Sequence, residues 1–275
     1  MAIVIRDVSF SYFDQQVIRG VTATFDRGLV HLLLGGTGSG KTTLALVLAG
    51  LARPVRGSVT VDGCDPASDR FDRSALQLAF QFPEVQIFET TVVKEIQYGL
   101  RNFGLAGPRM AERLDWAIGC VGLPRALLPK DPGSISFGER RKVALASVIA
   151  LKPKYLLLDE PLAGLDWHGR RNLVNTILRL RDHGLTTLVL THEADLVAEI
   201  GDTVSILAGG AMAGPMTPES FVASGPSADA LDQARHDLLP DFASALHKIS
   251  SPGHAIGTTP WLIEDVARAM IRAKI

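Results

Sequence analysis

The residues from Gly35 to Thr42 have the types and the spacing that suit them to hold a phosphate group. They read Gly-Gly-Thr-Gly-Ser-Gly-Lys-Thr and fit the pattern G-x-x-x-x-G-K-[ST]. Glycines let backbone N–H groups close on an anion because they have no Cβ that would clash. Lys41 supplies a positive charge for the β- and γ-phosphates, and the hydroxyl of Thr42 can bind Mg²⁺. The stretch therefore predicts a site for nucleotide phosphates.

A second group of candidate residues is acidic and follows an apolar run at 155–158. Asp159 and Glu160 come directly after this run, at the edge where ligands bind in open α/β sheets. The aspartate can hold Mg²⁺, and the glutamate can orient or deprotonate an attacking water. A solvated strand end is the alternative, but it is disfavoured beside a phosphate-binding loop.

His192 is the third candidate, because it follows the apolar run 186–190. A histidine at a strand end is usually only a polar cap. Here we expect it at the same sheet edge as Asp159 and the Gly-rich loop, which favours contact with the γ-phosphate.

The elements that must position these residues alternate along the chain. Residues 30–34 form an apolar run of strand length, and residues 43–49 form a helix that ends before Gly50. A strand, a Gly-rich turn and a helix are the context that the phosphate pattern requires. The helix N-terminus adds free N–H donors and the positive end of its dipole. A Gly-rich turn that matches by chance is the alternative.

Patterns in the rest of the chain predict an α/β fold. Strands are expected at 3–5, 8–12, 17–25, 58–61, 76–82 and 204–207, with a turn at 26–28. The stretch from 91 to about 128 has helical periodicity, and a helix is expected over 170–182. Ser136-Phe137-Gly138-Glu139 predicts a capping box, with Ser136 at the N-cap of a helix that runs to about Leu151.

Composition excludes several classes of protein. The 275 residues carry 28 basic and 29 acidic side chains, a net charge of −1 that gives no reason to expect nucleic acid as a partner. The two cysteines, Cys64 and Cys120, match no metal-site spacing and indicate a reducing compartment. No signal peptide opens the chain, and no run approaches the ~20 apolar residues of a membrane-spanning helix. A soluble or peripheral protein is expected.

Taken in order, these motifs resemble the nucleotide-binding domain of ABC ATPases, over residues 1 to about 214. The resemblance implies a P-loop NTPase (RecA-like) fold with an antiparallel β subdomain, a helical subdomain at about 83–150, and ATP with Mg²⁺ as cofactors. It implies that an aromatic residue stacks on adenine and that the Walker A loop and the D-loop bind ATP: Tyr12, Gly35, Gly36, Thr37, Gly38, Ser39, Gly40, Lys41, Thr42, Thr43 and Asp166. From spacing alone, Tyr12 is more simply explained as an aromatic at a strand edge.

The same resemblance implies the remaining roles. Glu160, His192 and the Q-loop glutamine Gln81 are the catalytic residues, and Thr42, Gln81 and Asp159 are the metal ligands. Residues 135–139 stand where the family has Leu-Ser-Gly-Gly-Gln, so Ser136, Gly138 and Glu139 would meet the ATP held by a second protomer. One protomer then has only half a site, and ATP closes the dimer.

One departure from the family pattern is Phe137, which replaces the first glycine of the signature motif, while Glu139 replaces glutamine. A phenyl ring crowds a helix start meant to approach the γ-phosphate, and a carboxylate facing anions costs ~1 kcal/mol. We hypothesise that sites using this motif turn over slowly, or that the protein works beside a more regular ATPase.

Residues 80–89 and the tail resemble energy-coupling-factor (ECF) ATPases, which power the uptake of vitamins and transition metals. The tail motifs are Leu-Pro-Asp-Phe-Ala at 239–243 and Thr-Thr-Pro-Trp-Leu at 258–262, followed by a stripe of Leu262, Val266 and Met270. The resemblance implies a C-terminal helical extension at 215–275 that serves in dimerisation. A helical tail packed on its own domain is the alternative.

This resemblance also implies partners and a location. It implies a dimer with itself or a paralogous ATPase, a transmembrane T component and a substrate-binding S component. The protein would lie peripherally on the cytoplasmic face of the cell membrane. The alternatives are the ATPase of another ABC importer or exporter, a soluble ABC ATPase acting on DNA repair or ribosomes, and a nucleotide-binding subunit with little hydrolysis.

Overall fold

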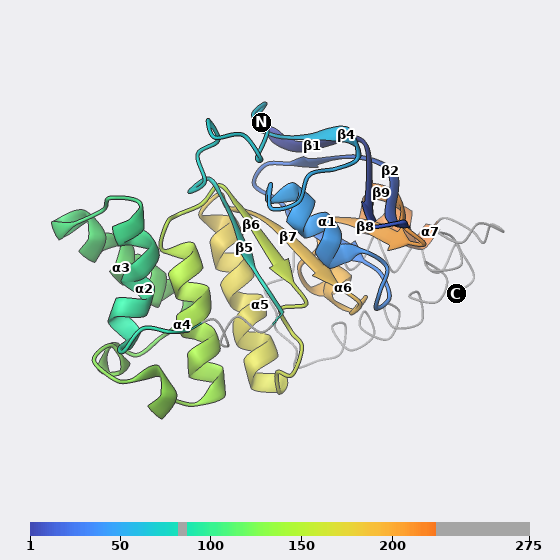
Figure 1. Cartoon of the computed structure of the whole chain (residues 1–275). Coiled ribbons are helices and arrows are strands. Elements are labelled where there is room, and N and C mark those ends of the chain that lie inside the picture. Colours follow the sequence, from blue (N-terminus) through green and yellow to red (C-terminus); the bar gives the residue numbers. More distant parts are fainter. Residues whose placement is uncertain (82–86, 224–275) are drawn as a thin grey trace. The chain divides into compact units, whose positions relative to one another are not determined.

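The computed structural model describes residues 1–81 and 87–223 and divides into two compact units (Figure 1). Unit 1 contains Met1–Phe71 and the described residues from Leu188 onward, and unit 2 is Asp72–Thr187. None of the helices in the described ranges is both long enough and apolar enough to cross a lipid bilayer.

An antiparallel sheet forms the first part of unit 1. Its strands are β1 (Ala2–Tyr12), β2 (Gln15–Asp26) and β4 (Arg56–Val61), in the order β2-β1-β4. Ile3 pairs with Phe25 on one side and Val61 on the other, and all three side chains are buried. Alternation of buried and exposed residues fits a sheet with one covered face. The strands predicted at 3–5, 8–12, 17–25 and 58–61 are confirmed.

The rest of unit 1 positions the Gly-rich loop. Strand β3 (Val30–Leu34) is buried along its whole length and runs parallel to β8 (Thr203–Ala208), which pairs antiparallel with β9 (Ala211–Met216). Helix α1 (Lys41–Leu48) follows β3, and α6 (Leu196–Ile200) and α7 (Pro218–Ala223) complete the described part. Strand β7 (Thr186–Thr191) crosses the boundary, and its last residues neighbour β3 in the order β7-β3-β8-β9.

Unit 2 combines parallel strands with helices. Strands β5 (Leu76–Ala79) and β6 (Tyr155–Asp159) pair in parallel, and Thr186 at the start of β7 donates its N–H to the carbonyl of Lys154. The helices are α2 (Val92–Asn102), α3 (Gly107–Val121), α4 (Phe137–Ile149) and α5 (Trp167–Asp182), with short 3-10 turns η2 (Arg125–Leu127) and η3 (Pro132–Ser134). The helical periodicity over 91–128 is therefore confirmed, and so is the mixed α/β class.

Two predicted boundaries were wrong. The strand expected over 76–82 ends at Ala79, and Phe82 lies outside the described residues. The helix expected from Arg170 begins three residues earlier, at Trp167, because Asp166 caps it.

Much of the predicted C-terminal extension at 215–275 lies outside the described residues, which end with α7 at Ala223. This includes both tail motifs and the stripe of Leu262, Val266 and Met270. The division into a 1–214 domain and a 215–275 extension, with a helical subdomain at about 83–150, stays a prediction.

Candidate functional site

The Gly-rich loop of unit 1 connects β3 to α1 and needs glycine at three of its positions, Gly35, Gly38 and Gly40. Gly40, the N-cap of α1, has φ 104°, and Gly38 has φ 79°. A Cβ on Gly40 would lie 2.9 Å from Ile18 Cδ1, and one on Gly35 would lie 2.5 Å from the carbonyl oxygen of Leu207. These close approaches let the loop curl tightly around the start of the helix.

Lys41 is held inside this loop. Its side chain is buried, and its Nζ donates to the carbonyl of Gly35 at 2.7 Å and to that of Gly36 at 3.1 Å. The ammonium group therefore lies against the first residues of the loop, where a phosphate bound by the loop N–H groups would meet it.

Hydroxyl groups around the loop fit a phosphate and a divalent cation. The Oγ of Ser39 is buried and has no hydrogen-bond partner among the described residues, which is costly unless a ligand supplies one. Thr42 is exposed at the first turn of α1, whereas Thr43 is buried. A hydroxyl is the hard oxygen donor that Mg²⁺ prefers, so the Thr42 hydroxyl could supply one ligand to this metal.

Two more predicted residues belong to unit 1. The N–H of Gly35 donates to the carbonyl of Thr191 at 3.2 Å, which places the end of β7, and with it His192, next to the start of the loop. Tyr12 is 45% exposed at the end of β1 and packs edge-to-face on Phe10, with ring centroids 4.9 Å apart. An exposed tyrosine face is available for stacking.

The acidic pair lies at the end of β6 in unit 2. Asp159 is the last residue of the strand and is buried, while Glu160 is partly exposed. Glu160 has φ 46°, in the left-handed region that non-glycine residues rarely adopt. Such strain is typical of functional turns and persists only where neighbouring groups fix the backbone.

Helix α4 starts with the predicted capping box. The carboxylate Oε2 of Glu139 accepts from the N–H of Ser136 at 2.8 Å and from its hydroxyl at 2.7 Å, and the N–H of Glu139 donates back to Ser136 Oγ. These bonds to Ser136 lower the pKa of Glu139. The negative charge of Glu139 therefore interacts with the N-terminus of its own helix. A Cβ added at Gly138 would meet no other atom within 4 Å.

Phe137 is 43% exposed, and the guanidinium carbon of Arg140 lies 6.0 Å from the centre of its ring. The ring is not among the residues that line the cavity beside α4. Whether it slows turnover stays a prediction.

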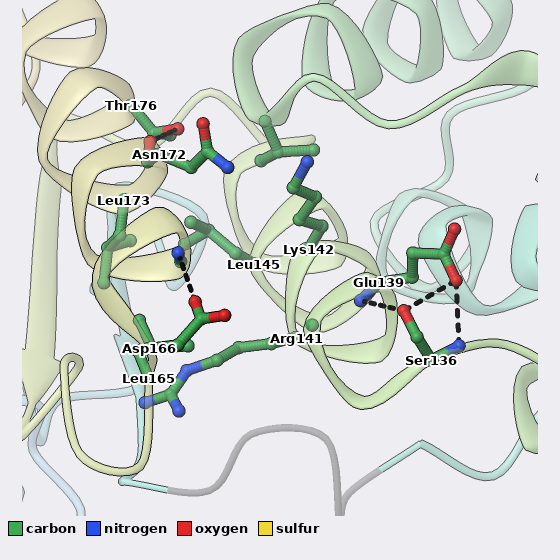
Figure 2. A pocket seen from close by; sticks show the side chains of 13 residues that line it. Ser136, Glu139, Arg141, Lys142, Leu145, Leu165, Asp166, Asn172, Leu173 and Thr176 are labelled. Atoms are coloured by element: carbon green, nitrogen blue, oxygen red, sulfur yellow. Dashed lines mark hydrogen bonds between the residues drawn. The ribbon is translucent and has the colours of Figure 1, made fainter.

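The starts of α4 and α5 border one cavity of about 260 Å³, drawn in Figure 2. Asp166 caps α5 through a bond from the N–H of Gly169 to its Oδ1 at 2.7 Å. The lining combines both helix starts with apolar side chains deeper between the helices: Val121, Ser136, Gly138, Glu139, Arg141, Lys142, Leu145, Leu165, Asp166, Gly169, Asn172, Leu173 and Thr176.

The predicted residues therefore fall into two groups, one in each unit. Unit 1 holds the loop, His192 and Tyr12, and unit 2 holds the acidic pair, the α4 start and Asp166. Gln81 is exposed in unit 2, and its carbonyl accepts from Arg141 at 3.3 Å. Sequence reasoning missed Arg141 and the cavity residue Asn172, because nothing in their local pattern marks them.

Comparison with known proteins identifies the chain's relatives. The family model described as ABC transporter matches residues 18–163. The energy-coupling factor transporter ATP-binding protein EcfA2 of Latilactobacillus sakei is 36% identical over 287 residues, covering 100% of this chain and 97% of the relative. A putative ABC transporter ATP-binding protein of Pyrococcus furiosus is 39% identical, covering 75% and 80%.

Solved structures give a matching picture. The structure of cbiO1 from Clostridium perfringens, described as part of the ABC transporter complex cbiONQ, aligns with a TM-score of 0.73 at 25% identity. The alignment covers 93% of this chain and 96% of the other.

Proposed function

The chain belongs to the ABC transporter ATP-binding family and is an ATPase; from this premise we propose that it powers an importer of the ECF type. The observation that carries the proposal is the likeness to an ECF ATP-binding protein over 100% of this chain and 97% of that relative. The cargo proposed is a vitamin or a transition-metal ion, chosen by a separate substrate-binding S component.

In unit 1, the proposed ATP-binding residues act through position and charge. The N–H groups of the loop and the ammonium of Lys41 bind the phosphates, and Tyr12 stacks on the adenine. His192 reads the γ-phosphate. Two observations support this assignment. The buried Ser39 hydroxyl has no hydrogen-bond partner among the described residues, and the backbone at Gly35 leaves no room for a Cβ.

In unit 2, the proposed catalytic residues act on the water and the metal. Glu160 orients or deprotonates the attacking water, and Gln81 responds to the partner subunits. The metal ligands that the resemblance implies are Asp159 and Gln81 of this unit and Thr42 of unit 1; Mg²⁺ would supply charge neutralisation at the β- and γ-phosphates when bound.

The proposed active form is a dimer with a second copy or a paralogous ATPase. The N-terminus of α4, with Ser136 and Gly138, would face the γ-phosphate bound by the other protomer. The α4 start is partly exposed, and its N-cap hydroxyl is set by Glu139, which leaves it accessible to a partner.

We expect the membrane partner to bind the aromatic pair after Gln81. Phe88 and Tyr98 are 63% and 41% exposed, and their rings pack edge-to-face 4.7 Å apart. The buried carboxylate of Glu95 fixes this surface by accepting the N–H groups of Phe88 and Glu89 at 3.1 and 2.9 Å. Rigid exposed aromatic side chains are typical anchors of protein interfaces. They support peripheral attachment to the cytoplasmic face of the membrane through a T component.

The test is a tagged pull-down from detergent-solubilised membranes of the native host, comparing wild type with the Phe88→Ala/Tyr98→Ala double variant. We expect wild type to recover a T component and a small substrate-binding membrane protein, and the double variant to lose at least about tenfold of both. Leu51→Ala is the matched control, because Leu51 is an apolar side chain 60% exposed in unit 1.

Recovery of an ordinary pair of permease subunits would replace the ECF proposal with another ABC transporter. Recovery only in the soluble fraction, with DNA or ribosomes, would overturn the transport function.

A further inference from the structure

Arg141 of α4 joins three parts of unit 2 through one buried guanidinium group. Its Nη1 donates to the carbonyl of Ala163 at 2.7 Å, and its Nη2 donates to the carbonyls of Pro161 at 2.6 Å and Gln81 at 3.3 Å. The residue is only 7% exposed. Figure 2 shows the side chain extending from α4 toward the loop that precedes α5.

Two of these carbonyls belong to the turn that begins at Glu160. This residue has φ 46°, and its carbonyl accepts the N–H of Ala163 at 3.2 Å, which closes the turn. A glutamate in the left-handed region returns to an ordinary conformation unless the following backbone is fixed. Arg141 supplies that constraint, since it binds the carbonyl of the next residue, Pro161, and that of Ala163.

We propose that Arg141 is a positioning residue for ATP hydrolysis. It holds the Glu160 turn in its left-handed conformation and connects this turn to Gln81 and to α4. The inference rests on the proposed function, in which Glu160 acts on the attacking water. In this role Arg141 acts through the backbone of the turn, whose Pro161 and Ala163 carbonyls it binds.

The chemistry of the side chain explains why an arginine stands at this position. A planar guanidinium carries five N–H donors in a fixed fork and stays charged when buried. Its Nη1 and Nη2 groups donate within this plane to three carbonyls at once, whereas the ammonium of a lysine has no such fork and can hold only some of them. The Gln81 carbonyl binds the same guanidinium group as the carbonyls of the Glu160 turn. A movement of the backbone at Gln81 would therefore shift the Glu160 turn as well.

The experiment measures kcat, KM and the Kd for MgATP in the assembled transporter, for Arg141→Gln and Arg141→Lys. We expect Arg141→Gln to lower kcat at least about tenfold while the Kd changes less than about threefold, because the phosphates bind elsewhere. Arg141→Lys should restore part of the rate, since it keeps a cation near the carbonyls.

The matched control is Arg113→Gln. Arg113 in α3 of the same unit also donates from Nη1 to a carbonyl, that of Leu151 at 3.0 Å, but touches neither Gln81 nor the Glu160 turn. The proposal would be overturned if Arg141→Gln and Arg113→Gln lowered Tm by the same amount and also lowered kcat by the same factor. If Arg141→Gln does not fold, Arg141→Lys decides it, and wild-type kcat in that variant counts against positioning.

A double-mutant cycle separates this inference from the proposed function. If Arg141 acts mainly through Glu160, Arg141→Gln should lower the residual single-turnover rate much less on a Glu160→Gln background than in wild type. Full hydrolysis in Glu160→Gln would remove Glu160 from its role and overturn the functional assignment. Loss in Glu160→Gln with a wild-type rate in folded Arg141→Gln would overturn only the positioning role.

Discussion

At the scale of single residues, Phe137 is the side chain that departs most from the expected chemistry. It occupies the first helical position of α4, between the capping Ser136 and Gly138, and its ring is 43% exposed. In the proposed dimer the start of α4 approaches a phosphate closely, and there an exposed ring takes up space that a glycine would leave open. Backbone N–H donation itself is unaffected, because phenylalanine adopts helical φ and ψ without strain.

Replacing Phe137→Gly should therefore raise the ATPase rate of the assembled complex. We expect an increase of about threefold to tenfold, which corresponds to ~1 kcal/mol in the barrier. Steady-state phosphate release measures it. Phe103→Ala is the control, since Phe103 is also 43% exposed but follows α2. An unchanged or lower rate would contradict the crowding hypothesis.

His31 is a residue whose ionisation affects stability rather than chemistry. It is buried in β3, with Nε2 2.7 Å from the carbonyl of Asp26 and Nδ1 2.7 Å from Thr203 Oγ1. Since a carbonyl only accepts, Nε2 donates to it; in the neutral form, which burial favours, Nδ1 then accepts from the hydroxyl of Thr203. Burial lowers the pKa of His31 below 6.5, against the opposing effects of the Asp26 carbonyl and the Asp202 charge.

The sign of the pH effect follows from that lowered pKa. Below pH 6.5 the unfolded chain binds a proton at His31 that the folded chain does not. The free energy of unfolding is therefore not reduced by His31 above pH 6.5, and it falls as the pH drops from 6.5 toward the pKa of the folded state. The loss is at most about 1.4 kcal/mol per pH unit for one proton. Urea unfolding of wild type and His31→Gln between pH 7.5 and 5.5 should show that the free energy of unfolding changes less with pH in the variant. Equal slopes would rule out His31 as the titrating group.

Local spacing accounts for the residues that could be predicted. The Gly-rich loop, the Ser136–Glu139 box and the acidic pair all join residues close together in sequence, so pattern and spacing reveal them. Arg141 could not be found in this way, because its carbonyl partners lie 20 to 60 residues away along the chain. Its role depends on tertiary packing rather than on any local pattern.

At the scale of elements, the N-caps of α4 and α5 fix the positions of the candidate residues at the starts of these two helices. Asp166 accepts the N–H of Gly169 and starts α5 at Trp167. Without that cap, the first turn of α5, which borders the cavity, has an unsatisfied donor. The cap therefore sets the position of the D-loop as well as the stability of the helix.

Asp166→Ala should lower the free energy of unfolding by ~1 kcal/mol, whereas Asp166→Asn should keep most of it because asparagine caps equally well. Chemical denaturation followed by circular dichroism measures both. A loss in Asp166→Asn as large as in Asp166→Ala would show that charge, rather than the capping bond, supports this end of α5.

Elements outside strong periodic runs were the ones that the sequence did not reveal. Strand β9 and the short helix α6 were not predicted, since β9 contains Gly214 and Pro215 and α6 has only five residues. Strand β9 pairs with β8 across the two-residue turn of Gly209 and Gly210, so this contact is local along the chain. Pairing with β8 therefore outweighed the weak strand propensity of β9, and α6 is too short for a periodic pattern to reveal it.

At the scale of the whole molecule, the proposed mechanism depends on a second protomer. The α4 start carries Ser136 and Gly138 on an exposed surface, and in the proposed dimer it completes the ATP site of the other protomer. In this proposed dimer, hydrolysis would separate the protomers by removing the γ-phosphate between them, so a variant that binds but does not hydrolyse ATP should accumulate the closed form.

Glu160→Gln should therefore trap an ATP-bound dimer, because it removes the proposed base and leaves the phosphate-binding loop intact. With MgATP, light scattering should give twice the 29.5 kDa of one chain for Glu160→Gln, and mainly monomer for wild type after turnover. Adding Lys41→Ala to Glu160→Gln should abolish the dimer, since the loop then loses its charge for the phosphates. A Glu160→Gln protein that hydrolyses ATP at the wild-type rate would contradict the assignment. A protein that stays monomeric until a paralogous ATPase is added would show that the composite site forms only between unlike subunits, in keeping with the altered signature motif at Phe137.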